Sequence, residues 1–309
     1  MQLKMYLVMA LAAGLMGAAA AGAPADSAGP TAPLAAQQEL GRLLFFEPAL
    51  SINGKRSCAS CHRPEKAFTD HRGTSRALRF ASNLRRNSPT LLNAADQTSF
   101  FHDGRAGSLA AVVEAVLTNP DEFGSSYALA AERLNGSAEY RRRFRRAFRA
   151  PAGAATINAA LAAYLGTLTA THSAYDQALA GGPALPANAA AGAALFAGTG
   201  NCARCHGGPQ FRDGLRHEVA PGQWVKTPTL RNVALTMPYR ADGGAPTLPA
   251  VLADAYHRTL PARPLTAADV DDLTAFLGAL TDTAATARRE LPTLPALPAL
   301  PDRVVGGLY

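Results

Sequence analysis

Apolar residues recur at helical spacing in several stretches of the chain. They stand three or four positions apart between residues 35 and 46, and a similar stretch covers residues 189–197. Such spacing places apolar side chains on one face of a helix. Residues 266–269 read Thr-Ala-Ala-Asp, which is the capping box that begins a helix. Two longer stripes are Ile157, Leu161, Leu165 and Leu168, and Val270, Leu273, Leu277 and Leu280. No region is rich in strand signals, so we predict an all-α fold.

Glycine and proline divide these helical stretches into two groups. Residues 181–187 carry both residue types and predict a linker between a first domain, residues 35–180, and a second domain, residues 188–285. Residues 286–309 form a tail with a repeated Pro-Ala-Leu pattern. Proline cannot continue a helix, so we predict that this tail lies extended over the surface.

The N-terminal residues have the form of a secretory signal peptide. Lys4 supplies a positive start, residues 5–16 form a short apolar run, and small residues follow. We therefore predict a cleaved signal over residues 1–23, a flexible linker over residues 24–34, and export to the periplasm. The apolar run is too short for a comfortable membrane span, and no other segment qualifies, so we expect no span in the mature protein.

The chemistry of the chain is concentrated in two copies of one motif. Residues 58–62 read Cys-Ala-Ser-Cys-His, and residues 202–206 read Cys-Ala-Arg-Cys-His. Two thiols at this spacing can attach one haem covalently, and the following histidine becomes an axial ligand of its iron. We therefore predict two c-type haems. The residues are Cys58, Cys61, Cys202 and Cys205 for attachment, and His62 and His206 for the iron.

Other uses of these cysteines are conceivable. The alternatives are two local disulfides or a zinc site made of cysteine and histidine. The two motifs use all 4 cysteines of the chain. Two copies, together with a predicted export signal, favour covalent haem over both alternatives.

The charge of the chain changes this interpretation little. The formal net charge is +7, and each haem would add about two negative propionates. The holoprotein is therefore closer to neutral than the sequence suggests, and we do not predict nucleic-acid binding. The arginine-rich run at residues 141–146 is interpreted as a solvated helix face, or alternatively as a docking patch for an acidic partner.

The two halves of the chain share an internal repeat. Residues 88–93 read Ser-Pro-Thr-Leu-Leu-Asn, and residues 227–232 read Thr-Pro-Thr-Leu-Arg-Asn. A constant separation of 139 positions relates the pairs Pro89 and Pro228, Asp103 and Asp242, and Leu109 and Leu248. A match of this length without a gap indicates two domains built on one plan. We therefore predict two tandem c-type cytochrome domains, each with one haem.

The two haems need not have the same role. A haem that only transfers electrons normally has two axial ligands, whereas one that activates peroxide needs an open face and an acid–base group. The predicted first domain, residues 35–180, contains no methionine. The residues able to supply a sixth ligand are His71, His102 and His172 in the first half, and Met237, Tyr256, His217 and His257 in the second.

Glu122 is the candidate acid–base residue of the first half. It lies in a segment that reads Asn-Pro-Asp-Glu-Phe-Gly, residues 119–124. The same letters fit a helix N-terminus, with Asn119 as the cap, Pro120 at the first position and Glu122 at the third. Gly124 weakens the helix interpretation, but both remain open on these residues alone.

From about residue 40 to residue 280 the chain resembles the bacterial dihaem cytochrome c peroxidase/MauG family. The motifs that carry the resemblance are residues 40–46, 57–62, 86–90, 103–105 and 227–239. The resemblance implies that His62 serves a peroxide-binding haem and His206 an electron-transfer haem. It also implies that Glu122 is the catalytic glutamate.

The resemblance further implies a calcium ion between the haems. Asn87 falls on the side-chain ligand of that ion, and Thr236 and Pro238 fall on its two backbone carbonyl ligands. Oxygen donors of this type suit calcium.

The chain departs from the family pattern around the first haem. Peroxidases that need reductive activation carry a distal histidine whose place here is near Arg79. Its absence implies a haem that stays open, as in MauG, unless His71 replaces it. The glutamine and proline that usually line the distal pocket correspond to Val112 and Val116.

Further departures concern the second haem and the path to it. The tryptophan that usually precedes Asp-Gly-Arg is replaced by His102, so His102 and the single tryptophan, Trp224, become candidate electron relays. The sixth ligand of the second haem is methionine in the peroxidases and tyrosine in MauG. Tyr256 lies in the matching segment, so we predict Tyr256 as this ligand, with Met237 as the alternative.

Residues 100–105, Phe-Phe-His-Asp-Gly-Arg, also resemble the MbnH-like enzymes, MauG-like dihaem proteins that oxidise a tryptophan on a companion protein. We therefore predict a periplasmic dihaem oxidoreductase that uses hydrogen peroxide. It would oxidise a residue of a partner protein, such as tryptophan, through a high-valent dihaem state. The alternative is a dihaem cytochrome c peroxidase that draws electrons from a small cytochrome c or cupredoxin. A third hypothesis is a non-enzymatic dihaem electron carrier.

Overall fold

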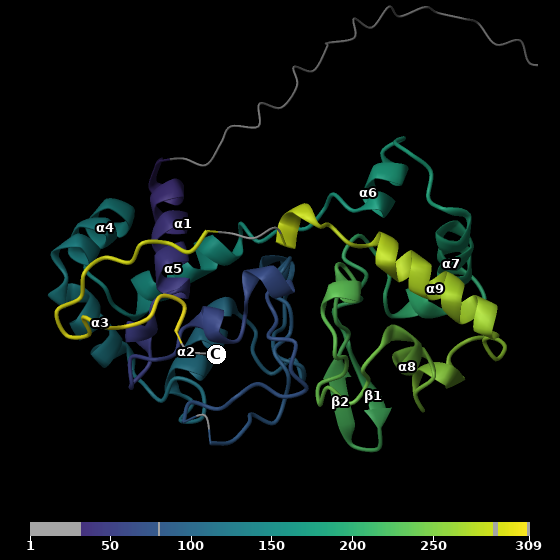
Figure 1. Cartoon of the computed structure of the whole chain (residues 1–309), viewed down its shortest axis with the longest axis horizontal. Helices are drawn as coiled ribbons and strands as arrows, with labels where there is room; N and C mark the ends of the chain where they lie inside the picture. The colour runs from purple at the N-terminus through teal and green to yellow at the C-terminus, as the bar shows by residue number, and fades with distance from the viewer. Residues whose placement is uncertain (1–31, 80, 287–289, 308–309) are drawn as a thin grey trace, which may run out of the picture.

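Helices dominate the computed structural model, which describes residues 32–79, 81–286 and 290–307 (Figure 1). The helices are α1 Ala32–Phe45, α2 Leu109–Thr118, α3 Tyr127–Gly136, α4 Ala138–Phe148, α5 Ala154–Leu165, α6 Ala174–Leu179, α7 Ala187–Ala197, α8 Leu248–Leu252 and α9 Ala267–Ala279. The predicted fold of two mainly helical cytochrome c-type domains is confirmed. The predicted signal peptide, residues 1–23, lies outside the described residues.

One small sheet was not predicted from the sequence. Strands β1 Arg216–Ala220 and β2 Gln223–Lys226 form an antiparallel hairpin, in which Arg216 pairs with Lys226 and Glu218 with Trp224. Pro221 and Gly222 lie between the strands, and Gly222 has a positive φ of 72° that suits a tight turn. The hairpin projects from the second half beside the first half (Figure 1).

Each half is built around one close helix crossing. In the first half α1 packs against α5, and a Cβ on Gly41 would lie 1.9 Å from the carbonyl oxygen of Ala160. In the second half α7 packs against α9, and a Cβ on Gly192 would lie 1.9 Å from the carbonyl oxygen of Asp272. The two crossings depend on glycine because only glycine lets the backbones approach so closely. The predicted capping box is present at the start of α9.

The proline-rich tail returns from the second half to the first. It crosses the first half as an extended chain (yellow in Figure 1), which agrees with the predicted conformation. It is more than a surface covering, because Leu297 is 2% exposed and belongs to the first hydrophobic core. Arg303 binds both carboxylate oxygens of the fully buried Glu47, and Oε2 of Glu47 also accepts a hydrogen bond from Tyr140 at 2.6 Å.

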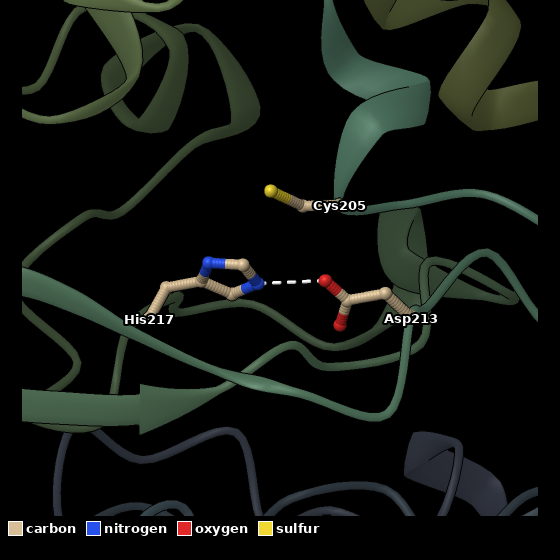
Figure 2. Close-up of side chains that lie close together, drawn as sticks. All are labelled: Cys205, Asp213 and His217. Carbon is tan, nitrogen blue, oxygen red and sulfur yellow. Dashed lines mark hydrogen bonds and ion pairs between the residues drawn. The ribbon is translucent and has the colours of Figure 1, made fainter.

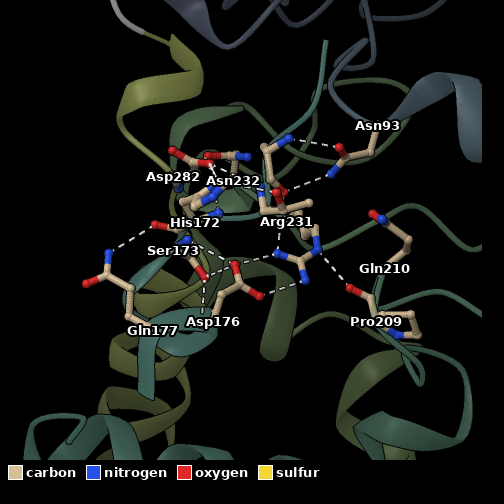
Figure 3. Close-up of polar contacts among 12 residues, drawn as sticks. Asn93, His172, Ser173, Asp176, Gln177, Pro209, Gln210, Arg231, Asn232 and Asp282 are labelled. Carbon is tan, nitrogen blue, oxygen red and sulfur yellow. Dashed lines mark hydrogen bonds and ion pairs between the residues drawn. The ribbon is translucent and has the colours of Figure 1, made fainter. Parts of the chain in front are cut away.

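A buried polar network joins the two halves (Figure 3). Arg231 binds both carboxylate oxygens of Asp176, at 2.8 and 2.9 Å, and also reaches the carbonyl of Pro209 at 2.7 Å. The side chain of Asn93 exchanges two hydrogen bonds with the backbone of Ala170. These contacts bring segments far apart in the sequence into one rigid joint.

Within the described part of the chain, no helix combines the length and the apolar character that a membrane span requires.

Candidate functional site

A cavity lies beside the first CxxCH motif. It measures about 890 Å³ with the space at its mouth included, and apolar side chains of α1, α2 and α5 form much of its wall. Cys58, Cys61 and His62 line this cavity, and so does Glu122. The fold therefore brings the first motif and the predicted acid–base residue to one site, and the apolar wall suits a porphyrin.

The histidine of each motif is prepared to bind a metal. Nδ1 of His62 lies 2.9 Å from the carbonyl oxygen of Phe68, and Nδ1 of His206 lies 3.1 Å from that of Phe211. A carbonyl only accepts, so Nδ1 carries the proton and Nε2 keeps the lone pair that an iron needs. Burial lowers the pKa of His62, and it lowers the pKa of His206 to about 4, so both rings are neutral at pH 7.

The cysteines also fit covalent haem. All four are free thiols, so the alternative of local disulfides is not met. Burial raises the pKa of Cys58 to about 12, and that of Cys61 and Cys202 to about 11. Two thiols and one neutral imidazole in each half, with an apolar cavity in the first, are the groups that a c-type haem requires.

Glu122 lies on a turn that follows α2. Asn119 is the C-cap of α2, so the alternative of a helix beginning at Asn119 is wrong. Its side-chain Nδ2 donates a hydrogen bond of 2.8 Å to Oε1 of Glu122. Burial raises the pKa of Glu122, and this hydrogen bond and the positive charges of Arg105 and Arg56 act against that rise. A raised carboxyl pKa suits a group that exchanges protons with a substrate.

The other candidate histidines of the first half lie away from the cavity. His71 is exposed, and its Nε2 contacts the carbonyl oxygen of Leu235 at 2.8 Å. The side chain of His172 is 84% exposed. Among the described residues that line the cavity, His62 is the only histidine. Val112 and Val116 lie on the same wall, as the resemblance suggested.

Tyr256 lies near the second motif. Burial raises the pKa of its phenol, and the proximity of Cys205 and Asp213 acts in the same direction. Met237, the alternative sixth ligand, has a side chain that is 47% exposed. Tyr256 therefore stays the predicted sixth ligand of the second haem, with Met237 as the alternative.

Two histidine–aspartate pairs lie in the second half. Nε2 of His217 lies 2.6 Å from Oδ2 of Asp213, beside the sulfur of Cys205 (Figure 2). Among the described residues, these three are the one group of at least three His, Cys, Asp or Glu side chains that could together hold a metal ion. Haem attachment would use the thiol of Cys205. Nδ1 of His257 lies 3.1 Å from both oxygens of Asp254. Each carboxylate thus orients an imidazole in the second half.

The proposed calcium ligands meet where the two halves touch. Nδ2 of Asn87 lies 3.1 Å from the carbonyl oxygen of Pro238 and 2.9 Å from that of Arg240. Its Oδ1 is buried without a partner among the described residues. Turning this amide by 180° would place three oxygens together, which is the donor set that calcium prefers. The residues therefore fit the ion. Thr236 is close in sequence, but its carbonyl has no contact that assigns it to the site.

The two candidate relays differ in their surroundings. His102 lies between the halves, with Nε2 3.2 Å from the carbonyl oxygen of Asn87, and burial lowers its pKa. Trp224 stands on β2 with 47% of its side chain exposed. His102 is thus placed for transfer within the molecule, and Trp224 for transfer at its surface.

Sequence profiles identify both halves. The profile of di-haem cytochrome c peroxidase matches residues 35–184, and the profile of cytochrome c matches residues 189–281. MauG of Methylorubrum extorquens is 39% identical over 236 residues, which are 69% of this chain and 66% of that protein. Cytochrome c551 peroxidase of Nitrosomonas europaea is 34% identical over 234 residues, 68% of this chain and 70% of the peroxidase. The chain belongs to the dihaem cytochrome c peroxidase/MauG family.

A solved structure supports the same assignment. A MauG-like protein associated with microbial copper homeostasis superposes with a TM-score of 0.75 and 29% identity, covering 82% of this chain and 91% of that one. Membership confirms the predictions of an oxidoreductase and of two c-type haems, and it supports a peroxide-using dihaem enzyme. The hypothesis of a non-enzymatic electron carrier is therefore not retained.

Sequence reasoning missed two residues of the first site. Arg56 lines the cavity, and its guanidinium donates to the carbonyl oxygens of Arg76 and Ala77. Asn119 holds one oxygen of Glu122. Their only signal in the sequence is proximity, because Arg56 stands two positions before Cys58 and Asn119 three positions before Glu122.

Proposed function

We propose that this family member is a MauG-like periplasmic oxidase, which uses hydrogen peroxide at the first haem to oxidise a residue of a partner protein. A tryptophan of the partner is the substrate favoured by the resemblance. The observation that carries the proposal is the wall of the first cavity. Among the described residues on this wall, His62 is the only histidine and Glu122 the only carboxylate. A haem held by this one imidazole would be able to bind peroxide at its iron.

The residues around that position have separate tasks. When bound, a haem attached at Cys58 and Cys61 and held by His62 would supply the iron chemistry for cleavage of the O–O bond of peroxide. Oε1 of Glu122 is held by Asn119, so the carboxylate has a fixed orientation in the cavity. Glu122 takes a proton from one peroxide oxygen and returns it to the other, which leaves as water. Reduction of peroxide to two waters requires two electrons and two further protons. The partner residue supplies the electrons.

The second half extends this proposal. Tyr256 is the proposed sixth ligand of the second haem, because an anionic phenolate favours a higher iron charge than a thioether does. His102 and Trp224 are the proposed relays between the haem sites and the partner. Asn87, with the carbonyls of Thr236 and Pro238, is the proposed site of one calcium ion.

A dihaem cytochrome c peroxidase is the second candidate function. It is favoured by the 34% identity with the cytochrome c551 peroxidase of Nitrosomonas europaea. The two functions differ in electron donor, so stopped-flow mixing of the holoprotein with peroxide and a reduced small cytochrome c separates them. A MauG-like oxidase should oxidise the donor slowly, and its peroxide-treated form should persist. Rapid steady-state oxidation of the donor would favour the peroxidase.

The role of Glu122 can be tested directly. Glu122→Gln keeps the size of the side chain and removes the base, so the reaction with peroxide should slow by about 10²–10⁴-fold. Because burial raises the pKa of Glu122, the wild-type rate should rise with pH through a value above that of an ordinary carboxyl. The variant should lack this rise. A variant that reacts at the wild-type rate would remove Glu122 from the mechanism.

A further inference from the structure

The internal repeat reappears in the contacts between the halves. The amide N–H of Asn87 donates to the carbonyl of Ala241 at 3.0 Å, and the N–H of Lys226 donates to the carbonyl of His102 at 2.8 Å. Lys226 follows Asn87, and Ala241 follows His102, by the same 139 positions. Each half therefore lends the same backbone group to the other. Lys226 stands in the second half where the proposed calcium ligand stands in the first.

Among the described residues, no carboxylate pairs with the ammonium of Lys226. Its Nζ donates a hydrogen bond to Oε1 of Gln97, which is neutral. Burial, together with the nearby charge of Arg212, lowers the pKa of this ammonium to about 8. The contacts present in the chain thus do not balance its charge.

Arg212 is in a similar position. Its Nη2 donates to the backbone carbonyl of Asp96 at 2.8 Å, whereas Nη1 is buried without a hydrogen-bond partner. The carboxylate of Asp96 gives Arg212 some electrostatic support, but that carboxylate accepts its hydrogen bond from Gln210 at 3.3 Å. Lys226 and Arg212 are therefore two neighbouring cations at the joint between the halves. Nη1 of Arg212 is a buried donor that has no acceptor among the described residues.

Buried charges normally have a counter-charge, because an unpaired ion loses its hydration without compensation. Arg212 directly follows Phe211, whose carbonyl orients His206. Lys226 lies two positions before Pro228, whose carbonyl also contacts His206. The two cations thus flank the segments that hold the axial histidine. A c-type haem carries two propionates, which are carboxylates and which pair well with guanidinium and ammonium groups.

We propose that Lys226 and Arg212 form a carboxylate-binding site between the two halves, and that a propionate of a bound haem occupies it. Lys226 is the counterpart of Asn87 in the internal repeat. The proposed carboxylate site therefore occupies the place in the second half that the proposed calcium site occupies in the first. The proposal requires the two haems of the family. It requires neither the MauG-like activity nor the calcium ion, so its test is independent of both.

The test uses the ferric holoprotein without peroxide. Lys226→Gln and Arg212→Gln should each shift the propionate bending band in the resonance Raman spectrum, because this band responds to hydrogen bonding of the carboxylate. The same variants should lower the midpoint potential of one haem, because a lost positive charge stabilises the ferric state. Lys226→Arg should restore the Raman band.

Arg216→Gln is the matched control. Arg216 pairs with Lys226 across the hairpin and is exposed, so this change removes one charge from the same hairpin while the hydrogen bonds of Lys226 to Gln97 and of Arg212 to Asp96 stay in place. Its Raman band should stay at the wild-type position. A haemochrome assay should confirm two haems per chain in every variant. An unchanged band in Lys226→Gln, or a band that responds to added acetate in the wild type, would overturn the proposal.

Discussion

A backbone carbonyl orients each histidine that follows a cysteine pair. Nδ1 of His62 donates a hydrogen bond to the carbonyl oxygen of Phe68, and Nδ1 of His206 donates to that of Phe211. Phe68 and Phe211 have positive φ angles, of 58° and 50°. This backbone conformation is uncommon outside glycine, so the turn is specified by its contacts rather than by local preference. Glu122 shows the same principle, because a neighbouring amide holds one of its oxygens. Contacts within the protein therefore orient these reactive side chains.

Single substitutions can identify the sixth ligand of the second haem. Tyr256→Phe removes the phenol that lies near Cys205, so the low-spin ferric signal of one haem should change in electron paramagnetic resonance. Met237→Leu should leave this signal nearly unchanged, because the Met237 side chain is 47% exposed. The reverse result would transfer the assignment to Met237 and favour the peroxidase function.

At the scale of elements, both halves depend on a helix pair in close contact. In α7, Gly192 faces the backbone of α9, whereas Gly278 within α9 has open space around its Cα. The two glycines therefore have different reasons to be present. One permits the crossing, and the other only adds flexibility to a helix.

Substitution by alanine separates these roles. Gly192→Ala places a methyl group 1.9 Å from the Asp272 carbonyl oxygen, so it should lower the free energy of unfolding by about 1–3 kcal/mol or more. Gly278→Ala should raise it by about 0.5–1 kcal/mol, because alanine favours the helix. Urea unfolding followed by circular dichroism measures both. Equal effects of the two changes would show that the crossing tolerates a wider separation.

At the scale of the whole molecule, the tail holds the first haem segment. The carbonyl of Gly306 accepts hydrogen bonds from the hydroxyls of Ser57 and Ser60, at 2.6 and 3.1 Å. Ser57 directly precedes the first CxxCH motif, and Ser60 lies within it. Arg303, three positions earlier, is anchored on Glu47. The end of the chain is thus part of the support for the first cavity.

Removing that anchor should be costly. Arg303→Leu leaves the carboxylate of Glu47 buried without its ion pair, so the free energy of unfolding should fall by about 3–5 kcal/mol. Adding Glu47→Gln to this variant should recover part of the loss, because a neutral amide is easier to bury. Asp302→Asn, at an exposed neighbouring position, should have little effect. Urea unfolding that is unchanged in Arg303→Leu would exclude the tail as a support.

The sequence by itself determined the features that depend on local spacing. Two thiols three positions apart and a following histidine define a haem motif without reference to the rest of the chain. The stripes in α5 and α9, and the repeat of 139 positions, are likewise visible because helical period and duplication are written along the chain. Glu122 was found in this way too, although two interpretations of its segment remained open.

Only the tertiary structure decided the features that depend on distant residues. It placed Glu122 on the cavity wall with Asn119 and Arg56, and it excluded a helix at Asn119. It paired Lys226 with Gln97, 129 positions away, and Arg303 with Glu47, 256 positions away. Burial and charge balance arise from such long-range contacts. A charged residue looks the same in a sequence whether solvent, an ion pair or a cofactor surrounds it, so these roles emerge only when the chain is folded.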